Sequence, residues 1–160
     1  QDNEISWLNW KLLRSNKAIF EFVKRLIEFR RSNRILHMKK RLMQMDSMSC
    51  GYPDVSLHGI RAWYPDTEYY SRHVGLLFCG KYAGGQDYIY IVFNMYWEKQ
   101  MLALPGLPAG LTWELSLCTD KNVELTVTEE RSCSVPARSI CIFKSKKAAK
   151  TAKTTGMAKK

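Results

Sequence analysis

Two carboxylates near the amino-terminal end, Asp2 and Glu4, are the residues whose type and spacing come closest to acid–base chemistry. A general acid and a general base work as a pair only when the fold holds both within hydrogen-bond reach of the reacting groups. Asp2 and Glu4 lie in a short terminal segment, and no local motif holds them there. We therefore assign no catalytic residue to these 160 residues.

Aromatic and polar side chains could instead contact a ligand. Two Trp residues lie among polar groups in the first ten residues, and an aromatic pair follows Asn94 at a predicted strand junction. Packing is the usual role of large aromatic side chains, so it stays the alternative for these. The candidate ligand-binding residues are Asp2, Asn3, Glu4, Trp7, Tyr96 and Trp97.

The five cysteines form no pattern that would hold a metal ion. Their number is odd, no Cys-x-x-Cys spacing occurs, and the three histidines are scattered. A zinc site needs such residues in a cluster, so we expect no metal site and no other cofactor. Cys79 and Cys141 lie in apolar runs, where a free thiol behaves as a small hydrophobe. A reducing, cytoplasmic compartment is the simplest interpretation.

One segment, residues 15–45, carries a strong helical pattern. Its apolar positions, spaced by three and four, are Ile19, Phe22, Val23, Leu26 and Ile27. Ser15 or Asn16 could cap the start of this helix. An apolar stripe of this width must pack on something, and the substitution Phe22→Asp should therefore make an isolated segment more soluble.

After Gly51 the hydrophobic period changes from 3.6 to 2, which predicts strands. Trp113 is expected to face the core, and Trp63 has a strand-core interpretation. About seven short strands with turn residues between them indicate an antiparallel sandwich or barrel. The strand-like segments are 56–63, 74–79, 88–95, 99–104, 112–117, 123–128 and 139–143.

The net charge of +10 comes mostly from the end of the chain. Seven lysines lie between Lys144 and Lys160 with no acid among them, so residues 1–143 carry only about +3. Such an Ala-, Thr- and Lys-rich stretch cannot bury enough apolar area to order itself, and we expect a solvated tail. A nucleic-acid partner is disfavoured, because aromatic and basic residues are not interleaved as in single-strand binders. No apolar run approaches the length of a membrane span.

Several motifs together resemble those of glycogen-debranching enzymes and isoamylases of glycoside hydrolase family 13. The opening Gln-Asp-Asn-Glu-x-Ser-Trp-Leu-x-Trp is the most specific of them. The later matches are Phe-Val-Lys-Arg-Leu-Ile-Glu-Phe-Arg-Arg at 22–31, His-Gly…Trp at 58–63, Gly-Leu-Leu-x-x-Gly at 75–80, Asp-x-Ile-Tyr…Asn at 87–94, Leu-x-Leu-Pro at 102–105 and Val-Pro-Ala-Arg-Ser at 135–139. The likeness covers about residues 1–144.

The resemblance implies a mainly β chain in which the last loop and helix of a (β/α)8 barrel precede an antiparallel β-sandwich. The implied division is a barrel remnant at 1–45, a carboxyl-terminal β-sandwich at 46–144 and a disordered basic tail at 145–160. The parent enzyme would cleave α-1,6-glucosidic branch links with a retaining mechanism. Such enzymes need two carboxyls about 5–5.5 Å apart. Those carboxylates would lie on the amino-terminal catalytic barrel, which is the implied partner together with α-glucan.

Two departures from the family pattern matter. The family usually has His-Pro after the double Arg, where this chain has Ser32-Asn33-Arg34, and its catalytic motifs are missing here. The alternative is a stand-alone β-sandwich module that binds α-glucan (glycogen or limit dextrin) on exposed aromatic side chains.

Overall fold

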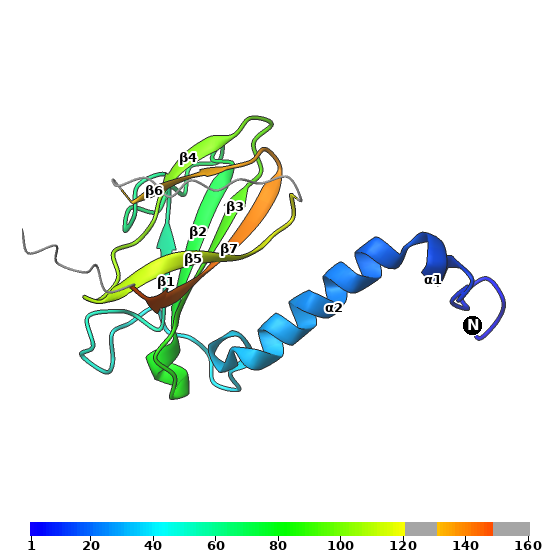
Figure 1. The fold of residues 1–160 in the computed structure, drawn as a ribbon, viewed down its shortest axis with the longest axis horizontal. Helices are drawn as coiled ribbons and strands as arrows, with labels where there is room; N and C mark the ends of the chain where they lie inside the picture. Colours follow the sequence, from blue (N-terminus) through cyan, green and yellow to red (C-terminus); the bar gives the residue numbers. More distant parts are fainter. Residues whose placement is uncertain (121–130, 149–160) are drawn as a thin grey trace, which may run out of the picture. The chain divides into compact units, whose positions relative to one another are not determined.

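The chain has two compact units, residues 1–41 and residues 42–160. The computed structural model describes residues 1–120 and 131–148. The first unit contains helices and the second contains strands (Figure 1). No helix in the described ranges is both long and apolar enough to cross a membrane.

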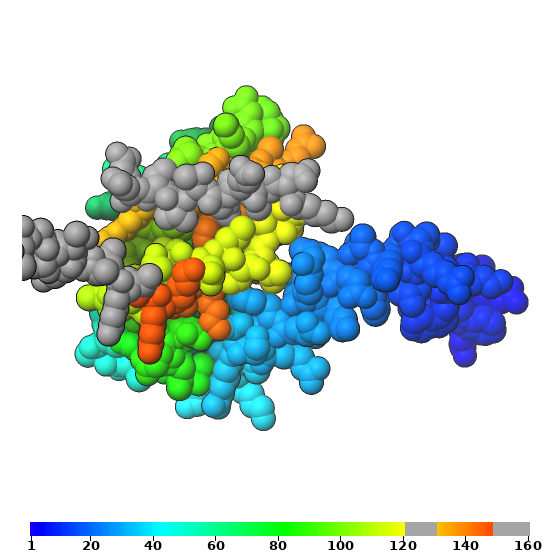
Figure 2. All heavy atoms as spheres, in the orientation of Figure 1, coloured from blue at the N-terminus to red at the C-terminus, as the bar shows by residue number. Residues whose placement is uncertain are grey.

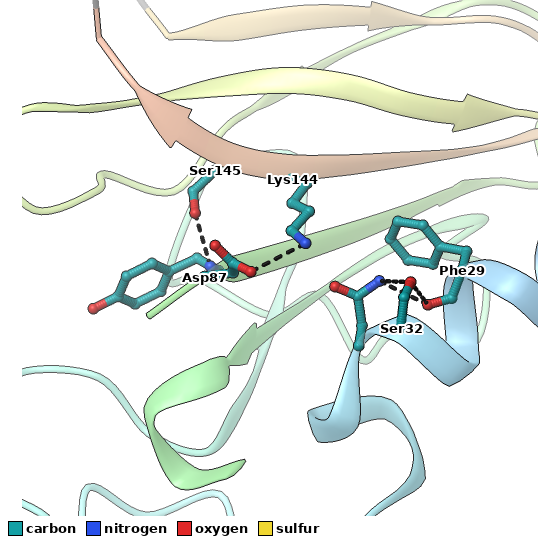
Figure 3. Close-up of polar contacts among 7 residues, drawn as sticks. Phe29, Ser32, Asp87, Lys144 and Ser145 are labelled. Carbon is teal, nitrogen blue, oxygen red and sulfur yellow. Dashed lines mark hydrogen bonds and ion pairs between the residues drawn. The ribbon is translucent and has the colours of Figure 1, made fainter. Parts of the chain in front are cut away.

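The first unit is built on one long helix. Its elements are α1 (Leu12–Ser15), α2 (Lys17–Ser32) and the 3-10 helix η1 (Arg34–His37). Neither predicted capping residue caps α2, because the Asn16 amide donates instead to the Leu12 carbonyl at 3.1 Å. At the other end, the Asn33 amide donates to the Phe29 carbonyl at 2.7 Å (Figure 3). The α-helix therefore ends at Ser32, well short of residue 45.

The apolar side chains of α2 cover about half of the helix circumference, since successive residues turn by about 100°. In order around the helix they are Phe29, Phe22, Leu26, Ile19, Val23, Ile27 and Phe20. No residue of α2 is buried, and Ile19 remains 63% exposed. Ile35 is the only buried apolar residue among residues 1–41, all of which are described. In Figure 2 the blue spheres of this unit form a slender body without a second layer of its own.

The second unit is mainly β and antiparallel. Its strands are β1 (Val55–His58), β2 (His73–Cys79), β3 (Tyr88–Asn94), β4 (Gln100–Ala103), β5 (Leu111–Cys118), β6 (Ser132–Val135) and β7 (Ser139–Lys147), and the 3-10 helix η2 (Gly80–Ala83) joins β2 to β3. Five strands form one sheet in the order β1-β2-β3-β7-β5, and β4 pairs with β6 in a second sheet (Figure 1). Every pairing between the described strands is antiparallel, as the sequence pattern predicts.

Both sheets contribute to one apolar core. Tyr90 and Phe143 of the large sheet belong to the same buried cluster as Leu102 and Val135 of the small sheet. The Tyr90 hydroxyl reaches the Ala103 carbonyl at 3.4 Å and so links the two sheets. Burial of these side chains removes apolar area from water at about 25 cal/mol per Å², which makes this cluster the main source of stability.

One glycine is required by the packing of this core. Gly75 lies on β2, and a Cβ there would collide with the ring and hydroxyl of Tyr90. The missing side chain therefore creates the space that a fully buried tyrosine needs. Burial also raises the pKa of the Tyr90 hydroxyl, so it stays protonated as a donor at neutral pH.

The structure corrects several strand boundaries. β1 ends at His58, and Trp63 lies in a loop with φ of 69° and 42% of its surface exposed, so its strand-core interpretation is wrong. β6 was missed, while the predicted segment 123–128 lies outside the described residues. β7 continues to Lys147, into the segment assigned to the tail. Trp113 does face the core, and its indole donates to the Pro105 carbonyl at 2.8 Å.

Candidate functional site

The opening residues form a compact turn that brings three of the candidate residues together. The Asn3 carbonyl accepts hydrogen bonds from the backbone amides of Ser6 at 3.0 Å and Trp7 at 3.2 Å. The Trp7 indole then donates to the Asp2 carboxylate at 2.6 Å. Glu4 lies within this turn and is exposed. The sequence therefore folds locally through Asn3, whose side chain also accepts from the Ile5 amide at 3.1 Å.

This turn presents a ring beside an anion but no catalytic pair. The Trp7 ring is 59% exposed, and one oxygen of Asp2 is already occupied by its indole. A sugar could stack on such a ring while the remaining carboxylate oxygen accepts from a hydroxyl. The geometry thus suits contact with a polar ligand. Acid–base catalysis would need a second ionisable side chain fixed beside Asp2 by the fold.

An apolar groove of about 450 Å³ continues from this turn within the first unit. Its lining is nearly all apolar, with Asn9 and Asn16 as the polar members. The apolar lining residues are Leu8, Trp10, Leu12, Leu13, Ile19, Phe20 and Val23. A groove of this composition fits apolar side chains of a protein better than it fits a sugar.

Tyr96 and Trp97 form a second candidate surface, on the connection between β3 and β4. Their rings stack with centroids 3.9 Å apart and planes at 28°, and Trp97 is 62% exposed. The Tyr96 amide donates to the buried Asn94 side chain at 3.0 Å, and the Tyr96 carbonyl accepts from the Arg138 amide at 2.9 Å. Of the two aromatic residues predicted to be exposed, Trp97 is exposed and Tyr96 is half-buried, and the backbone of Tyr96 is held by Asn94 and Arg138.

Asn94 is the residue that holds this surface in place. It is fully buried, and its amide nitrogen lies 2.8 Å from the Pro136 carbonyl and 2.9 Å from the Glu98 carbonyl. A third carbonyl, that of Val135, lies at 3.2 Å. The Asp-x-Ile-Tyr…Asn and Val-Pro motifs, which are about 40 residues apart in the chain, thus contact each other directly.

The His-Gly…Trp motif is also a structural unit. The His58 Nδ1 atom accepts the Trp63 amide at 2.7 Å, and the two rings meet at 4.8 Å. Because Nδ1 is the acceptor, Nε2 carries the proton and donates to Ser56 Oγ at 2.8 Å. Burial lowers the pKa of His58 to about 4, which keeps the ring neutral. Ser56 and His58 therefore cannot act as a nucleophile and its base.

Two adjoining hollows were missed by the sequence reasoning. They measure about 360 Å³ and 420 Å³, and both are lined by Asp66 and His73. Arg61 stacks on the Tyr64 ring at 4.9 Å beside one of them. The His73 Nε2 atom is buried without a hydrogen-bond partner and lies 3.6 Å from Asp66 Oδ2, which is too long for a hydrogen bond. The signal was the density of ionisable residues in positions 66–73.

Nowhere in residues 1–120 and 131–148 do three or more His, Cys, Asp or Glu side chains form a group that could hold a metal ion.

Two lysines near the end of β7 form ion pairs. Lys144 lies 3.0 Å from Asp87 (Figure 3), and Lys146 lies 2.7 Å from Glu114. The Ser145 hydroxyl between them accepts the Tyr88 amide at 2.8 Å (Figure 3). Residues 144–146 thus belong to the sheet and offer less free positive charge than the sequence indicates.

Neither the scanned protein-family models nor the curated proteins include a match to this chain. The functional argument therefore rests on the motifs and on the geometry of the described residues.

Proposed function

We propose that this chain is the carboxyl-terminal region of a glycogen-debranching or isoamylase-type glycoside hydrolase. The parent enzyme hydrolyses α-1,6-glucosidic links with a retaining mechanism, and its catalytic carboxylates lie on a preceding (β/α)8 barrel. Residues 1–41 supply the last loop and helix of that barrel, and the strands of the second unit follow as its carboxyl-terminal domain. The free thiols fit a cytoplasmic enzyme.

The observation that carries this proposal is the uncovered apolar face of α2. A surface helix of a globular protein typically has an apolar stripe at least about 100° wide, whereas the apolar residues of α2 extend over about 180°, with Arg30 as the one charged residue among them. A helix of the outer ring of a barrel packs on strands beneath it and on neighbouring helices at its sides, so it needs a face of that width. None of the seven large apolar side chains of α2 is buried within the first unit.

Reconstitution tests the proposal. The chain is added to a debranching-type barrel produced without its last helix and carboxyl-terminal domain, and hydrolysis of a limit dextrin is measured. We expect activity to appear with the chain and to be lost with Ile27→Asp, because a charge on the apolar face opposes docking. Glu28→Gln, on the charged face of the same helix, is the matched control and should restore activity fully. Absence of both binding and activity with the unaltered chain would count against the proposal.

A second candidate function is binding of α-glucan by the second unit itself. The exposed Trp97 ring, stacked on the half-buried Tyr96, favours it, since flat aromatic surfaces suit the apolar faces of sugar rings. Electrophoresis in a gel containing glycogen tests it. Retardation should be lost when both residues become Ala and kept with Tyr69→Ala, a 91% exposed control. Unchanged mobility of the double variant would exclude this surface.

A further inference from the structure

Two cysteines that lie far apart in the sequence meet in the large sheet. The sulfur atoms of Cys118 and Cys141 are 3.1 Å apart. The residues are direct partners in the pairing of β5 with β7. Both are free thiols in this structure. The sequence showed only an odd set of five cysteines without paired spacing, so the contact comes from the strand register alone.

The register also fixes the kind of pair. The Thr119 amide donates to the Ile140 carbonyl at 3.0 Å, which makes the next pair along the strands a hydrogen-bonded one. Antiparallel pairs alternate, so Cys118 and Cys141 form a non-hydrogen-bonded pair, in which the Cα atoms are about 4.5 Å apart. A disulfide requires a Cα separation of about 4.4–6.8 Å and a sulfur separation of about 2.05 Å. A pair of this kind falls within the first range, and the sulfurs, 3.1 Å apart, need to approach by only about 1 Å.

We propose that Cys118 and Cys141 are a reversible thiol-oxidation site, which forms an intramolecular disulfide by exchange with a low-molecular-weight disulfide such as oxidised glutathione. The two residues differ in access, which sets their order of reaction. Cys118 is half-buried at the margin of the core, whereas Cys141 is fully buried. Cys118 therefore meets the oxidant, and Cys141 resolves the intermediate.

The exchange balances in two steps. The Cys118 thiolate attacks one sulfur of oxidised glutathione, the glutathione S–S bond breaks, and one glutathione thiolate leaves. The Cys141 thiol then loses its proton to solvent and attacks the Cys118 sulfur, which releases the second glutathione thiolate. Two protein thiols are oxidised, one glutathione disulfide is reduced, and the two protons reside on the two glutathione thiols. Burial raises the pKa of the Cys141 thiol, so the second step is the slower one and quickens as pH rises.

The disulfide would fasten the last strand of the large sheet. Among the described strands, β5 lies at the end of the order β1-β2-β3-β7-β5 and pairs with β7. A covalent link between the two strands restricts the unfolded chain across the segment from Cys118 to Cys141. We expect the oxidised form to melt roughly 10 °C higher than the reduced form.

The test equilibrates the full chain with excess oxidised glutathione and maps its tryptic peptides by mass spectrometry. The expected product joins peptide 100–121, which contains Cys118, to peptide 139–144, which contains Cys141. Titration of the denatured protein should then find three free thiols in place of five. Dithiothreitol should restore all five and return the melting temperature to that of the reduced form.

The variants separate this site from general thiol oxidation. Cys118→Ser removes the proposed entry thiol, and Cys118→Ala does so without a hydroxyl, so both should lack the linked peptides and the gain in melting temperature. Cys50→Ser, the matched half-buried control, should keep both. A glutathione adduct on Cys118 that persists, a link between Cys141 and Cys133, or five free thiols after equilibration would each overturn the proposal.

Discussion

Residues 1–41 and the β unit both carry many large apolar side chains, yet they use them in opposite ways. The β unit buries residues such as Leu77, Tyr90 and Phe143 completely, whereas the first unit buries only Ile35 among its apolar residues. Two sheets can cover each other, because alternate side chains of each sheet point to the same core. A single helix has no second layer, so its apolar face stays exposed unless a partner covers it. The difference is what the proposed docking of the first unit on a barrel would explain.

The largest difference in unfolding free energy is expected between alanine variants of one phenylalanine in each unit. Phe143→Ala should lower the free energy of unfolding of the β unit by about 3–5 kcal/mol, because it leaves a cavity at a fully buried position. Phe20→Ala, at a residue 48% exposed on α2, should change it by less than about 0.5 kcal/mol. Urea denaturation followed by Trp fluorescence measures both. Equal losses for the two variants would break the contrast between the units.

An asparagine of each unit gives the next largest contrast. Asn94→Ala removes the side chain that satisfies buried carbonyls beneath the Tyr96 and Trp97 surface, and should cost about 2–3 kcal/mol. Asn9→Ala, at an exposed residue of the first unit, should cost less than about 0.5 kcal/mol. Denaturant titration of the two variants checks this. A small loss of unfolding free energy for Asn94→Ala would mean that other contacts hold the connection between β3 and β4.

The pH dependence of stability sharpens the comparison through His58. Its pKa is lowered from about 6.5 when unfolded to about 4 in the folded protein. The unfolded state therefore binds the proton first, so stability is complete above about pH 6.5 and falls as pH drops toward 4. We expect a loss of about 3 kcal/mol over that range.

Denaturation curves at a series of pH values measure this loss. His37→Gln, at an exposed residue of the first unit, should keep the same slope, while His58→Gln should flatten it. A slope that persists without His58 would assign the pH dependence to other groups.

The smallest effect on stability is expected from the apolar face of α2. Ile27→Asp should change the free energy of unfolding of the β unit by less than about 0.5 kcal/mol, because Ile27 is 52% exposed. It should nevertheless reduce self-association of the free chain, since a charge interrupts the exposed apolar face. Sedimentation velocity at increasing concentration measures that. If the unaltered chain stays monomeric at all concentrations, the apolar face of α2 does not drive self-association.

The sequence predicted the interior strands well and their ends poorly. β5 alternates apolar and polar residues closely, whereas β2 and β3 are nearly continuous apolar runs of the length expected for buried strands. An alternating pattern suggested a strand as far as Trp63, where the Trp63 amide instead bonds to His58 in a turn. β6 has only four residues, two of them serines, and gives too weak a pattern to detect.

The candidate site was predictable only where its contacts are local. The turn around Asn3 joins residues only a few positions apart in the chain, and Tyr96 and Trp97 are adjacent. Their residue types and neighbours were enough to suggest contact with a ligand. The hollows at Asp66 and His73 and the contact of Cys118 with Cys141 depend on strand pairings across long separations. Such register is set by tertiary packing, which a single sequence does not reveal.

Amide hydrogen exchange of residues 17–32, in the chain alone and with the truncated debranching-type barrel, tests the central claim most directly. The account predicts fast exchange in the free chain, because α2 has no buried residue to protect it, and strong protection once the barrel covers its apolar face. Amide protection of residues 17–32 that does not change on adding the barrel would contradict the claim that α2 packs on a barrel in the parent enzyme.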